Sequence, residues 1–325
     1  MSTRSSLRLL PLALGLLLIA VFVARIGVAT IQSELRRLGP ESLLILVPYA
    51  AGTALSAFPW AWCLERRFRP RATATIAGRF AASGANALLP FFGLAGEPCR
   101  LLWLAPGARA EGLAAIVVDR LLYNSAGGLL LLLGAAAALS SALPRALSGA
   151  AAVVGAILFG LSFGVLHAIS RWGIGRRSQR LLQRFLGSSY REPELGASVD
   201  AAIQRLSAAS ARRRLGAGLL LHFVARVVVA VEIYVALWSL HAPTTLRDAL
   251  ILSSVPIATS VVASSIPSQI GVQEGAQAFV CGALGLSPAL GLVLVLLQRL
   301  RQLAFAPLTL LLLASARPRA EVQPE

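Results

Sequence analysis

The sequence contains no lysine, one methionine, three cysteines and three histidines in 325 residues, and only 14% of it is charged. Cys63, Cys99 and Cys281 are odd in number and widely scattered. They therefore provide neither a disulfide framework nor the spacing of a metal site. The histidines are equally isolated, so we expect no bound metal and no cofactor.

Long polar segments are also lacking, so a separate soluble domain is not expected. Hydrophobic residues make up 57% of the chain, and the mean hydropathy is +0.74. Several apolar runs reach the roughly 20 residues that cross a bilayer. The net charge of +16 would suggest nucleic acid in a soluble protein, but the arginines gather at the ends of apolar runs, as the positive-inside rule predicts. We predict one all-α integral membrane domain over residues 1–325 that binds no nucleic acid.

Six apolar runs are predicted to span the membrane. Their residues are 9–24, 43–64, 113–139, 146–169, 215–240 and 288–314. The first run could be a signal peptide, but Arg25 follows it directly, where a cleavage site needs small neutral residues, so an uncleaved helix is favoured. Arginines cluster at residues 65–71 and 171–214. This distribution predicts a multi-pass membrane protein with both termini in the cytoplasm.

Two further apolar stretches, residues 72–105 and 250–286, are interrupted by helix-breaking residues. The breaks contain Pro90, Gly93 and Gly96 in the first stretch and Pro267, Gly271 and Gly275 in the second. Broken backbone at membrane depth is tolerated only where it is buried in protein or lines a wet cavity. We therefore expect two re-entrant or broken helical segments, with the first break at residues 90–98.

The two breaks share an order of residues. Glu97 follows Pro90 by seven residues and Glu274 follows Pro267 by seven, and in each half the next spanning helix carries an arginine, Arg120 or Arg299. The arginine distribution makes the helices that open the two halves cross in opposite directions, which predicts inverted-topology repeats with a substrate site between them. The expected organisation is a first helix and connector (1–39), repeat one (40–139), a linking helix and arginine-rich segment (140–214), repeat two (215–315) and a cytoplasmic tail (316–325).

Polar residues near the breaks are the candidate substrate-binding site. They are Asn86, Glu97, Arg100, Asp119, Arg120, Glu274 and Arg299. Arginine binds phosphate through a bidentate fork, and the glutamates could receive a cationic headgroup, neutralise the arginines or take up protons. Alternatively, the glutamates cap half-helices, and the neighbouring acidic and basic residues form ion pairs that only hold helices together. Arg226 and Glu232 are weaker candidates.

The segment 171–214 contains ten arginines. Within it, Val199, Ile203, Leu206 and Ser210 have helical spacing. This pattern predicts a surface-lying amphipathic helix in contact with anionic membrane lipids, or a solvated connector.

The residues around the two breaks also resemble a known family. Asn86-x-Leu88-Leu89-Pro90 with Gly96-Glu97 and Arg100, and Ile270 to Gly275 with Gln298-Arg299, are similar to the flippase-like family typified by the N-terminal membrane domain of lysylphosphatidylglycerol synthase. The Gly-Val-Gln-Glu-Gly form also resembles hopanoid-biosynthesis-associated membrane proteins of that family. The resemblance covers residues 7–315.

The resemblance implies movement of a phospholipid or a lipid-linked isoprenoid intermediate across the bacterial cytoplasmic (inner) membrane, with lipid-biosynthesis enzymes as partners. Because the sequence ends at Glu325 without an aminoacyl-transferase domain, we expect no aminoacyl transfer and no enzyme. Two alternatives stay open: a non-transporting scaffold or regulator of lipid synthesis, and an intramembrane lipid transferase that uses Asp119 or Glu274 as a base.

Overall fold

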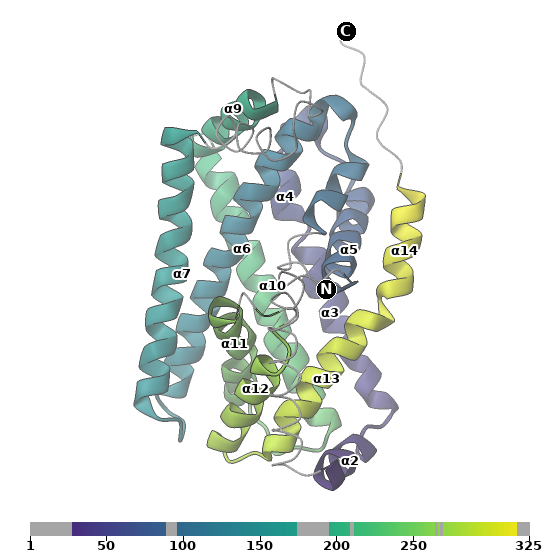
Figure 1. The fold of residues 1–325 in the computed structure, drawn as a ribbon, viewed down its shortest axis with the longest axis vertical. Coiled ribbons are helices and arrows are strands. Elements are labelled where there is room, and N and C mark those ends of the chain that lie inside the picture. Colours follow the sequence, from purple (N-terminus) through teal and green to yellow (C-terminus); the bar gives the residue numbers. More distant parts are fainter. Residues whose placement is uncertain are drawn as a thin grey trace, which may run out of the picture.

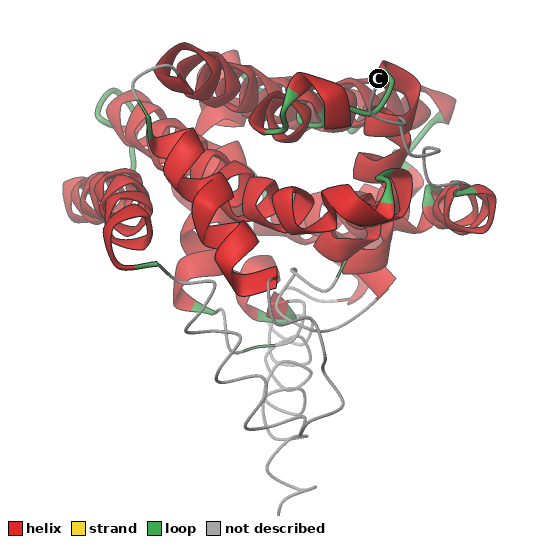
Figure 2. Ribbon diagram, turned by 90° about the horizontal axis from the view of Figure 1, so that it is seen from above, coloured by secondary structure: helices red, strands yellow, loops and turns green. Residues whose placement is uncertain are grey.

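The computed structural model describes residues 28–88, 96–173, 195–208, 211–263, 266 and 269–316. This part of the chain is helical and contains no strand (Figures 1 and 2). The α-helices are α2 (Val28–Arg36), α3 (Leu46–Leu55), α4 (Phe58–Cys63), α5 (Ala72–Leu88), α6 (Arg109–Ala138), α7 (Arg145–Trp172), α9 (Leu195–Ser207), α10 (Arg212–Ser239), α11 (Leu246–Val262), α12 (Val272–Ala283), α13 (Pro288–Ala304) and α14 (Ala306–Ser315). The 3₁₀ helices are η1 (Pro40–Ile45), η2 (Arg66–Phe68), η3 (Glu97–Trp103) and η4 (Pro106–Ala108).

Five helical stretches are long and apolar enough to cross a membrane. They are Pro40–Cys63, Pro106–Ala138, Arg145–Trp172, Arg212–Ser239 and Pro288–Ser315. Each matches one of the predicted runs, while the remaining predicted run, 9–24, lies outside the described residues. The all-α membrane fold is therefore confirmed, and the total number of spans stays a prediction.

Both interrupted stretches form paired segments, and they enter the bundle from opposite ends (Figure 1). In the first half, α3 and α4 lead to α5 and η3, which pack together, and then to α6. In the second half, α10 leads to α11 and α12, which also pack together, and then to α13 and α14. The two sets run in opposite directions along the long axis, as predicted. We call the end that carries α9, η2 and the start of α10 the arginine-rich end.

The first interrupted stretch differs in detail from a pair of half-helices. Its first arm, α5, is a continuous helix of 17 residues, whereas its second arm is the short 3₁₀ helix η3. Pro98 was expected inside the break but lies at the start of η3, where a missing backbone N–H is tolerated. Pro90 and Gly93 lie outside the described residues.

The second interrupted stretch contains Pro256 within α11. Because proline has no N–H, it leaves the carbonyl group four residues earlier without its helical donor. The side-chain amide nitrogen of Gln277 on α12, Nε2, fills this gap by donating to the Leu252 carbonyl at 3.1 Å. The second arm thus supplies the hydrogen-bond donor that the backbone of the first arm lacks, as burial in an apolar medium requires.

Glycines play different parts in the second break. Gly271 has a φ of +83°, in the left-handed region that favours glycine, and it is the N-cap residue of α12. The prediction that Gly275 belongs to the break is wrong: it lies in the first turn of α12, and its N–H donates to the Gly271 carbonyl. Pro267 lies outside the described residues.

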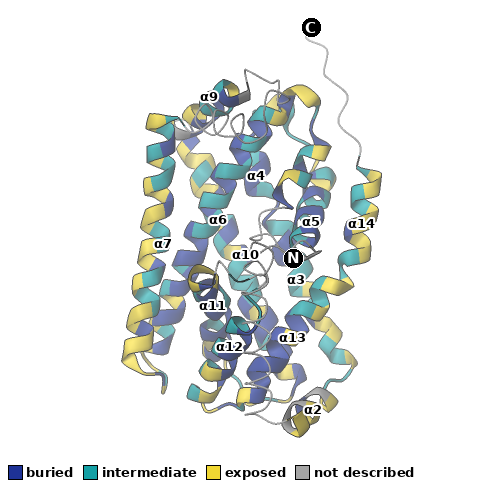
Figure 3. Cartoon of the chain, in the orientation of Figure 1, coloured by how far each residue is buried: buried dark blue, intermediate teal, exposed yellow. Residues whose placement is uncertain are grey.

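Burial separates the helices into an inner and an outer group. Buried residues gather on α6 and on α10 to α13, whereas α7 and α14 are largely exposed (Figure 3). Val153, Ile157 and Leu161 of α7 are each more than half exposed. In a membrane this apolar face contacts lipid at no cost, because lipid tails are as apolar as leucine.

Close backbone contact fastens α7 to α6. A Cβ atom on Gly128 would lie 2.6 Å from the Gly155 carbonyl oxygen, and one on Gly155 would lie 2.9 Å from the Gly128 carbonyl oxygen. Only glycine permits this approach, which is the common way for membrane helices to pack.

The predicted amphipathic helix exists as α9, but its apolar face does not lie on lipid. Ala202 and Ile203 are buried against Ala114 of α6 and Ile169 of α7. The helical spacing of the apolar residues in α9 shows that one face of this helix needs an apolar partner. That partner is the protein, through α6 and α7. Ser210 and residues 174–194 lie outside the described residues, so contact between this segment and anionic lipids stays a prediction.

Candidate functional site

Glu97, the first residue of η3, is the centre of a buried polar network. Its carboxylate is 4% exposed and lies 2.6 Å from Nη2 of Arg100, 3.2 Å from Nη1 of Arg120 and 3.4 Å from Nη1 of Arg79. The side-chain amide of Asn86 donates to the same carboxylate at 3.3 Å. Three arginines and one amide therefore converge on a single carboxylate.

Asn86 and Gly96 hold this carboxylate in place. The Asn86 side-chain oxygen accepts a hydrogen bond from the Gly96 N–H at 2.7 Å. A Cβ atom on Gly96 would lie 2.2 Å from the Ala82 carbonyl oxygen, so glycine is needed for η3 to approach α5. The Asn and Gly of the sequence motif thus join the two arms directly beside Glu97.

Arg100 connects Glu97 to a second buried carboxylate. Arg100 is 1% exposed, and its Nη1 donates to Oδ2 of Asp119 at 2.7 Å. The other carboxylate oxygen, Oδ1, lies 2.8 Å from Nε2 of the fully buried His222 on α10. The chain Glu97–Arg100–Asp119–His222 ties η3, α6 and α10 together.

Tyr123 is the meeting point of three guanidinium groups. The Arg226 guanidinium lies 3.9 Å from the centre of the tyrosine ring, and those of Arg120 and Arg79 lie 5.2 Å and 5.5 Å from it. Arg226 also donates twice to the Tyr123 carbonyl oxygen, at 3.1 Å and 3.2 Å. Gly127 makes room for this arginine, because a Cβ atom there would lie 3.0 Å from its Nη2.

This network carries more positive than negative charge. Four arginines, at positions 79, 100, 120 and 226, share two carboxylates, Glu97 and Asp119. Tyr123 and Arg226 lie near the middle of their long helices. A charge in such a place is costly, so these residues are a functional-site hypothesis by default. An arrangement with surplus guanidinium groups favours an anionic ligand.

The second break places its glutamate in a similar pair. Oε1 of Glu274 lies 2.6 Å from Nη2 of Arg299 on α13, and Oε2 accepts the Gly271 N–H at 2.8 Å. Glu274 therefore caps α12 and forms an ion pair at the same time, and its role in binding a substrate stays a prediction. Gln273 and Gln298 extend the contact between α12 and α13 at 3.3 Å.

The two pairs also share a pattern of exposure. Arg120 is 28% exposed and Arg299 is 31% exposed, whereas Glu97 and Glu274 are 4% and 10% exposed. In both halves the carboxylate is buried at the break and the arginine reaches it from the next spanning helix. None of the contacts of the described residues joins Glu97 to Glu274 directly.

Arg301 links the second half to the first. It forms an ion pair with the buried Glu232 of α10, and its guanidinium lies 4.3 Å from the centre of the Tyr49 ring on α3. The Tyr49 hydroxyl is in turn 3.3 Å from that of Ser83 on α5.

The structure thus sorts the predicted site residues into two groups. Asn86, Glu97, Arg100, Asp119 and Arg120 form one network, and Glu274 and Arg299 form a separate pair. Arg79, Tyr123 and His222 complete the first network and were not predicted as site residues from the sequence. Arg301 was not predicted either, and Arg226 and Glu232, the partner of Arg301, were only weaker candidates. The available signal was the same for most of them, since each is a polar residue within an apolar run.

Comparison with known protein families identifies the family of this chain. The model of the lysylphosphatidylglycerol synthase TM region matches residues 8–310, a range that contains both breaks and both glutamate–arginine pairs. The chain belongs to this family. As a member of the lysylphosphatidylglycerol synthase TM region family, it is a multi-pass membrane protein linked to lipid metabolism. No curated protein and no solved structure gave a significant match.

Proposed function

We propose that the protein is a flippase-like transporter. It moves a phospholipid or a lipid-linked isoprenoid intermediate across the bacterial cytoplasmic membrane, with both of its termini in the cytoplasm. The observation that carries this proposal is the pair of glutamate–arginine contacts at two oppositely oriented breaks. Each contact joins a buried carboxylate to an arginine that is about a third exposed.

A phosphate headgroup needs a partner while it crosses the apolar interior, because an unpaired charge there is very unfavourable. Arg120 and Arg299 supply guanidinium forks that suit phosphate oxygens. When no lipid is bound, Glu97 and Glu274 neutralise these arginines. A phosphate group can then replace a carboxylate as the partner of the arginine, and the site never holds an unpaired cation.

The surplus of positive charge supports an anionic substrate over a cationic one. Arg79 and Arg226 remain beside Tyr123 when Arg120 changes its partner. The tyrosine ring holds these cations through its negative face. A headgroup that reaches Arg120 thus enters a region where several guanidinium groups attract it.

The enzymatic alternative requires a free base. Both oxygens of Asp119 are occupied, by Arg100 and His222, and both oxygens of Glu274 are occupied, by Arg299 and the Gly271 N–H. Each carboxylate is thus already engaged by two donors in this conformation, and a lipid hydroxyl would have to compete with them. These contacts favour binding and release of the lipid without covalent change.

The test is transport in liposomes that contain the purified protein and a headgroup-labelled lipid whose outer-leaflet fluorescence is quenched by dithionite. Arg120→Gln and Arg299→Gln each remove one charge-assisted hydrogen bond, worth about 1.5–3 kcal/mol. We expect each to slow lipid movement roughly 10- to 150-fold. Arg145→Gln is the matched control, because Arg145 is exposed at the start of α7 and outside both pairs.

Two results would contradict the proposal. If the wild-type protein moves no lipid across a panel of phospholipid and polyprenyl phosphate headgroups, a scaffold or regulator of lipid synthesis becomes the better interpretation. If the wild-type protein moves lipid but both arginine variants match the Arg145→Gln control, the exchange of partners at the glutamates is wrong.

A further inference from the structure

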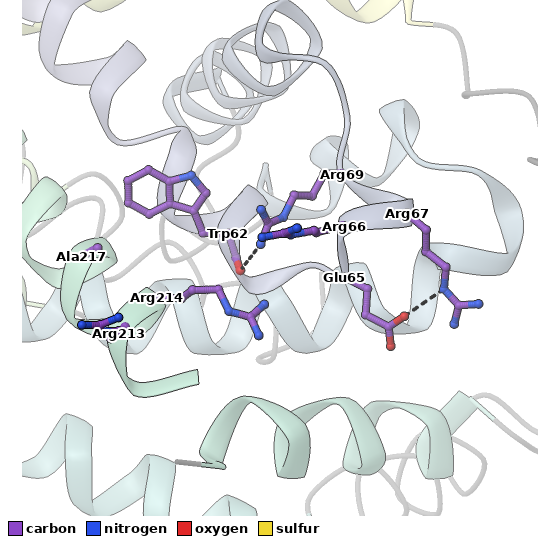
Figure 4. Close-up of a pocket in the computed structure, with 8 residues that line it drawn as sticks. All are labelled: Trp62, Glu65, Arg66, Arg67, Arg69, Arg213, Arg214 and Ala217. Atoms are coloured by element: carbon purple, nitrogen blue, oxygen red, sulfur yellow. Dashed lines mark hydrogen bonds and ion pairs between the residues drawn. The ribbon is translucent and has the colours of Figure 1, made fainter. Parts of the chain in front are cut away.

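A hollow of about 780 Å³ lies at the arginine-rich end of the bundle (Figure 4). One wall is the end of α4 with η2, and the other is the first turns of α10. The lining residues are Trp62, Glu65, Arg66, Arg67, Arg69, Arg213, Arg214 and Ala217. None of them belongs to the Glu97 network. The volume falls within the range of roughly 300–1,000 Å³ that is typical of small-molecule sites.

The lining is strongly cationic, with five arginines and one glutamate. Glu65 is already engaged, because it pairs with Arg67 at 2.8 Å and also with Arg205 of α9. Arg66, Arg213 and Arg214 form no ion pair within the part of the chain that the structure describes. Among the described residues, these three lining arginines therefore have no carboxylate partner.

Two backbone carbonyl groups hold the Arg69 side chain beside the other lining arginines. It donates to the Leu64 carbonyl at 3.1 Å and to the Trp62 carbonyl at 3.2 Å. Partial burial and the positive charges of Arg214 and Arg66 lower the pKa of Arg69. These guanidinium groups therefore lie close enough to repel one another, and a bound anion would relieve that repulsion.

The start of α10 adds a second unfavourable arrangement. Its first turn contains Arg212, Arg213 and Arg214 and no acidic residue, and the side chain of its N-cap residue, Ala211, makes no capping hydrogen bond. A helix N-terminus carries partial positive charge and unsatisfied N–H groups, so it favours anions over arginines. The positive-inside rule explains why arginines lie at this end, but not why five of them surround one hollow.

We propose that this hollow binds a phosphate monoester, and that the headgroup of an anionic membrane lipid supplies it. Guanidinium groups from both walls can hold the phosphate oxygens bidentately. Trp62 lines the same hollow, and an indole ring there suits the level of the lipid glycerol backbone, where tryptophan is enriched in membrane proteins. Binding here does not depend on transport through the Glu97 network.

Calorimetric titration of the full-length protein in a neutral detergent tests this site. The probe is dihexanoyl phosphatidic acid, a short-chain lipid that stays dispersed, so no charged membrane surface contributes. Glycerol 3-phosphate carries the same phosphate without acyl chains, and dihexanoyl phosphatidylcholine carries acyl chains with a zwitterionic headgroup. We expect saturable binding of one phosphatidic acid, weaker binding of glycerol 3-phosphate and no saturable binding of phosphatidylcholine.

Two double variants distinguish binding by the arginines that line the hollow from attraction by other positive charges at the arginine-rich end. Arg213→Gln/Arg214→Gln removes two lining arginines, and Arg109→Gln/Arg212→Gln removes two exposed arginines from the same end that do not line the hollow. We expect the first to weaken binding about 30-fold, from roughly a factor of five per arginine, and the second to leave it nearly unchanged. Circular dichroism and gel filtration confirm that both variants are folded.

Three outcomes would overturn the proposal. Equal weakening in the two double variants would show that diffuse charge attracts the lipid, and the absence of saturable binding would remove the site altogether. Glycerol 3-phosphate that binds as tightly as phosphatidic acid would refute the lipid source and assign the hollow to soluble phosphate compounds. Failure of lipid transport in liposomes would leave this binding result unaffected.

Discussion

Arg100 and Arg120 both contact Glu97, but their replacement by glutamine should have different consequences. Arg100 is 1% exposed and is held between two buried carboxylates, at 2.6 Å and 2.7 Å. Arg120 is 28% exposed and contacts Glu97 at 3.2 Å. We predict that Arg100→Gln damages the fold, whereas Arg120→Gln damages transport and leaves the fold nearly intact.

The magnitudes follow from burial. Breaking a buried ion pair by removing one partner costs about 3–5 kcal/mol, because the remaining carboxylate stays desolvated without its cation. A partly exposed pair is worth about 0–1 kcal/mol, and without Arg120 the Glu97 carboxylate still contacts Arg79, Arg100 and Asn86. An unfolding entropy of about 2.1 cal/mol/K per residue amounts to about 0.7 kcal/mol/K for 325 residues. Arg100→Gln should therefore lower the melting temperature by about 4–7 °C, and Arg120→Gln by less than about 2 °C.

Thermal unfolding in detergent, followed by circular dichroism and by loss of the monodisperse gel-filtration peak, measures both shifts. The double variant Arg100→Gln/Asp119→Asn should recover part of the loss, because it also removes the carboxylate left without a cation. Equal melting temperatures for Arg100→Gln and the wild type, or equal losses in the two single variants, would refute this division between a structural and a functional arginine.

Two further predictions concern packing and topology. Gly128→Ala should destabilise the protein by about 1–3 kcal/mol, because its Cβ would meet the α7 backbone. Gly160→Ala should have almost no effect, because no atom lies within 4 Å of the added Cβ. Equal melting temperatures of the two variants would contradict the close contact between α6 and α7. In a Cys99→Ser background, the remaining Cys63 and Cys281 are buried. An impermeant maleimide applied to intact cells should then label an Arg145→Cys variant and not an Arg109→Cys variant. Labelling of both, or of Arg109→Cys alone, would refute the proposed orientation.

The sequence predicted the parts of the site that repeat. The shared order of proline, glycine and glutamate followed by an arginine on the next helix pointed to Glu97 with Arg120 and to Glu274 with Arg299, and the structure brings both pairs together. Asn86 was also predicted from its place in the first motif. These contacts join elements that are near in sequence or related by the repeat. The spacing of the residues along the sequence is therefore enough to predict them.

The remaining contacts depend on how distant helices face each other. Arg226 reaches Tyr123 across 103 positions because Gly127 leaves space for its guanidinium, and the periodicity of an apolar helix does not reveal that space. His222 meets Asp119 in the same way. Likewise, the amphipathic pattern of α9 predicted one buried face but could not distinguish protein from lipid as its partner.

Arg299 and Arg301 lie two positions apart on α13, which places them about 200° apart around the helix. One is paired with Glu274 of α12 and the other with Glu232 of α10. In the proposed exchange, a lipid that replaces Glu274 as the partner of Arg299 would release only one side of α13. The opposite side of α13 would stay joined to α10 through Arg301 and Glu232.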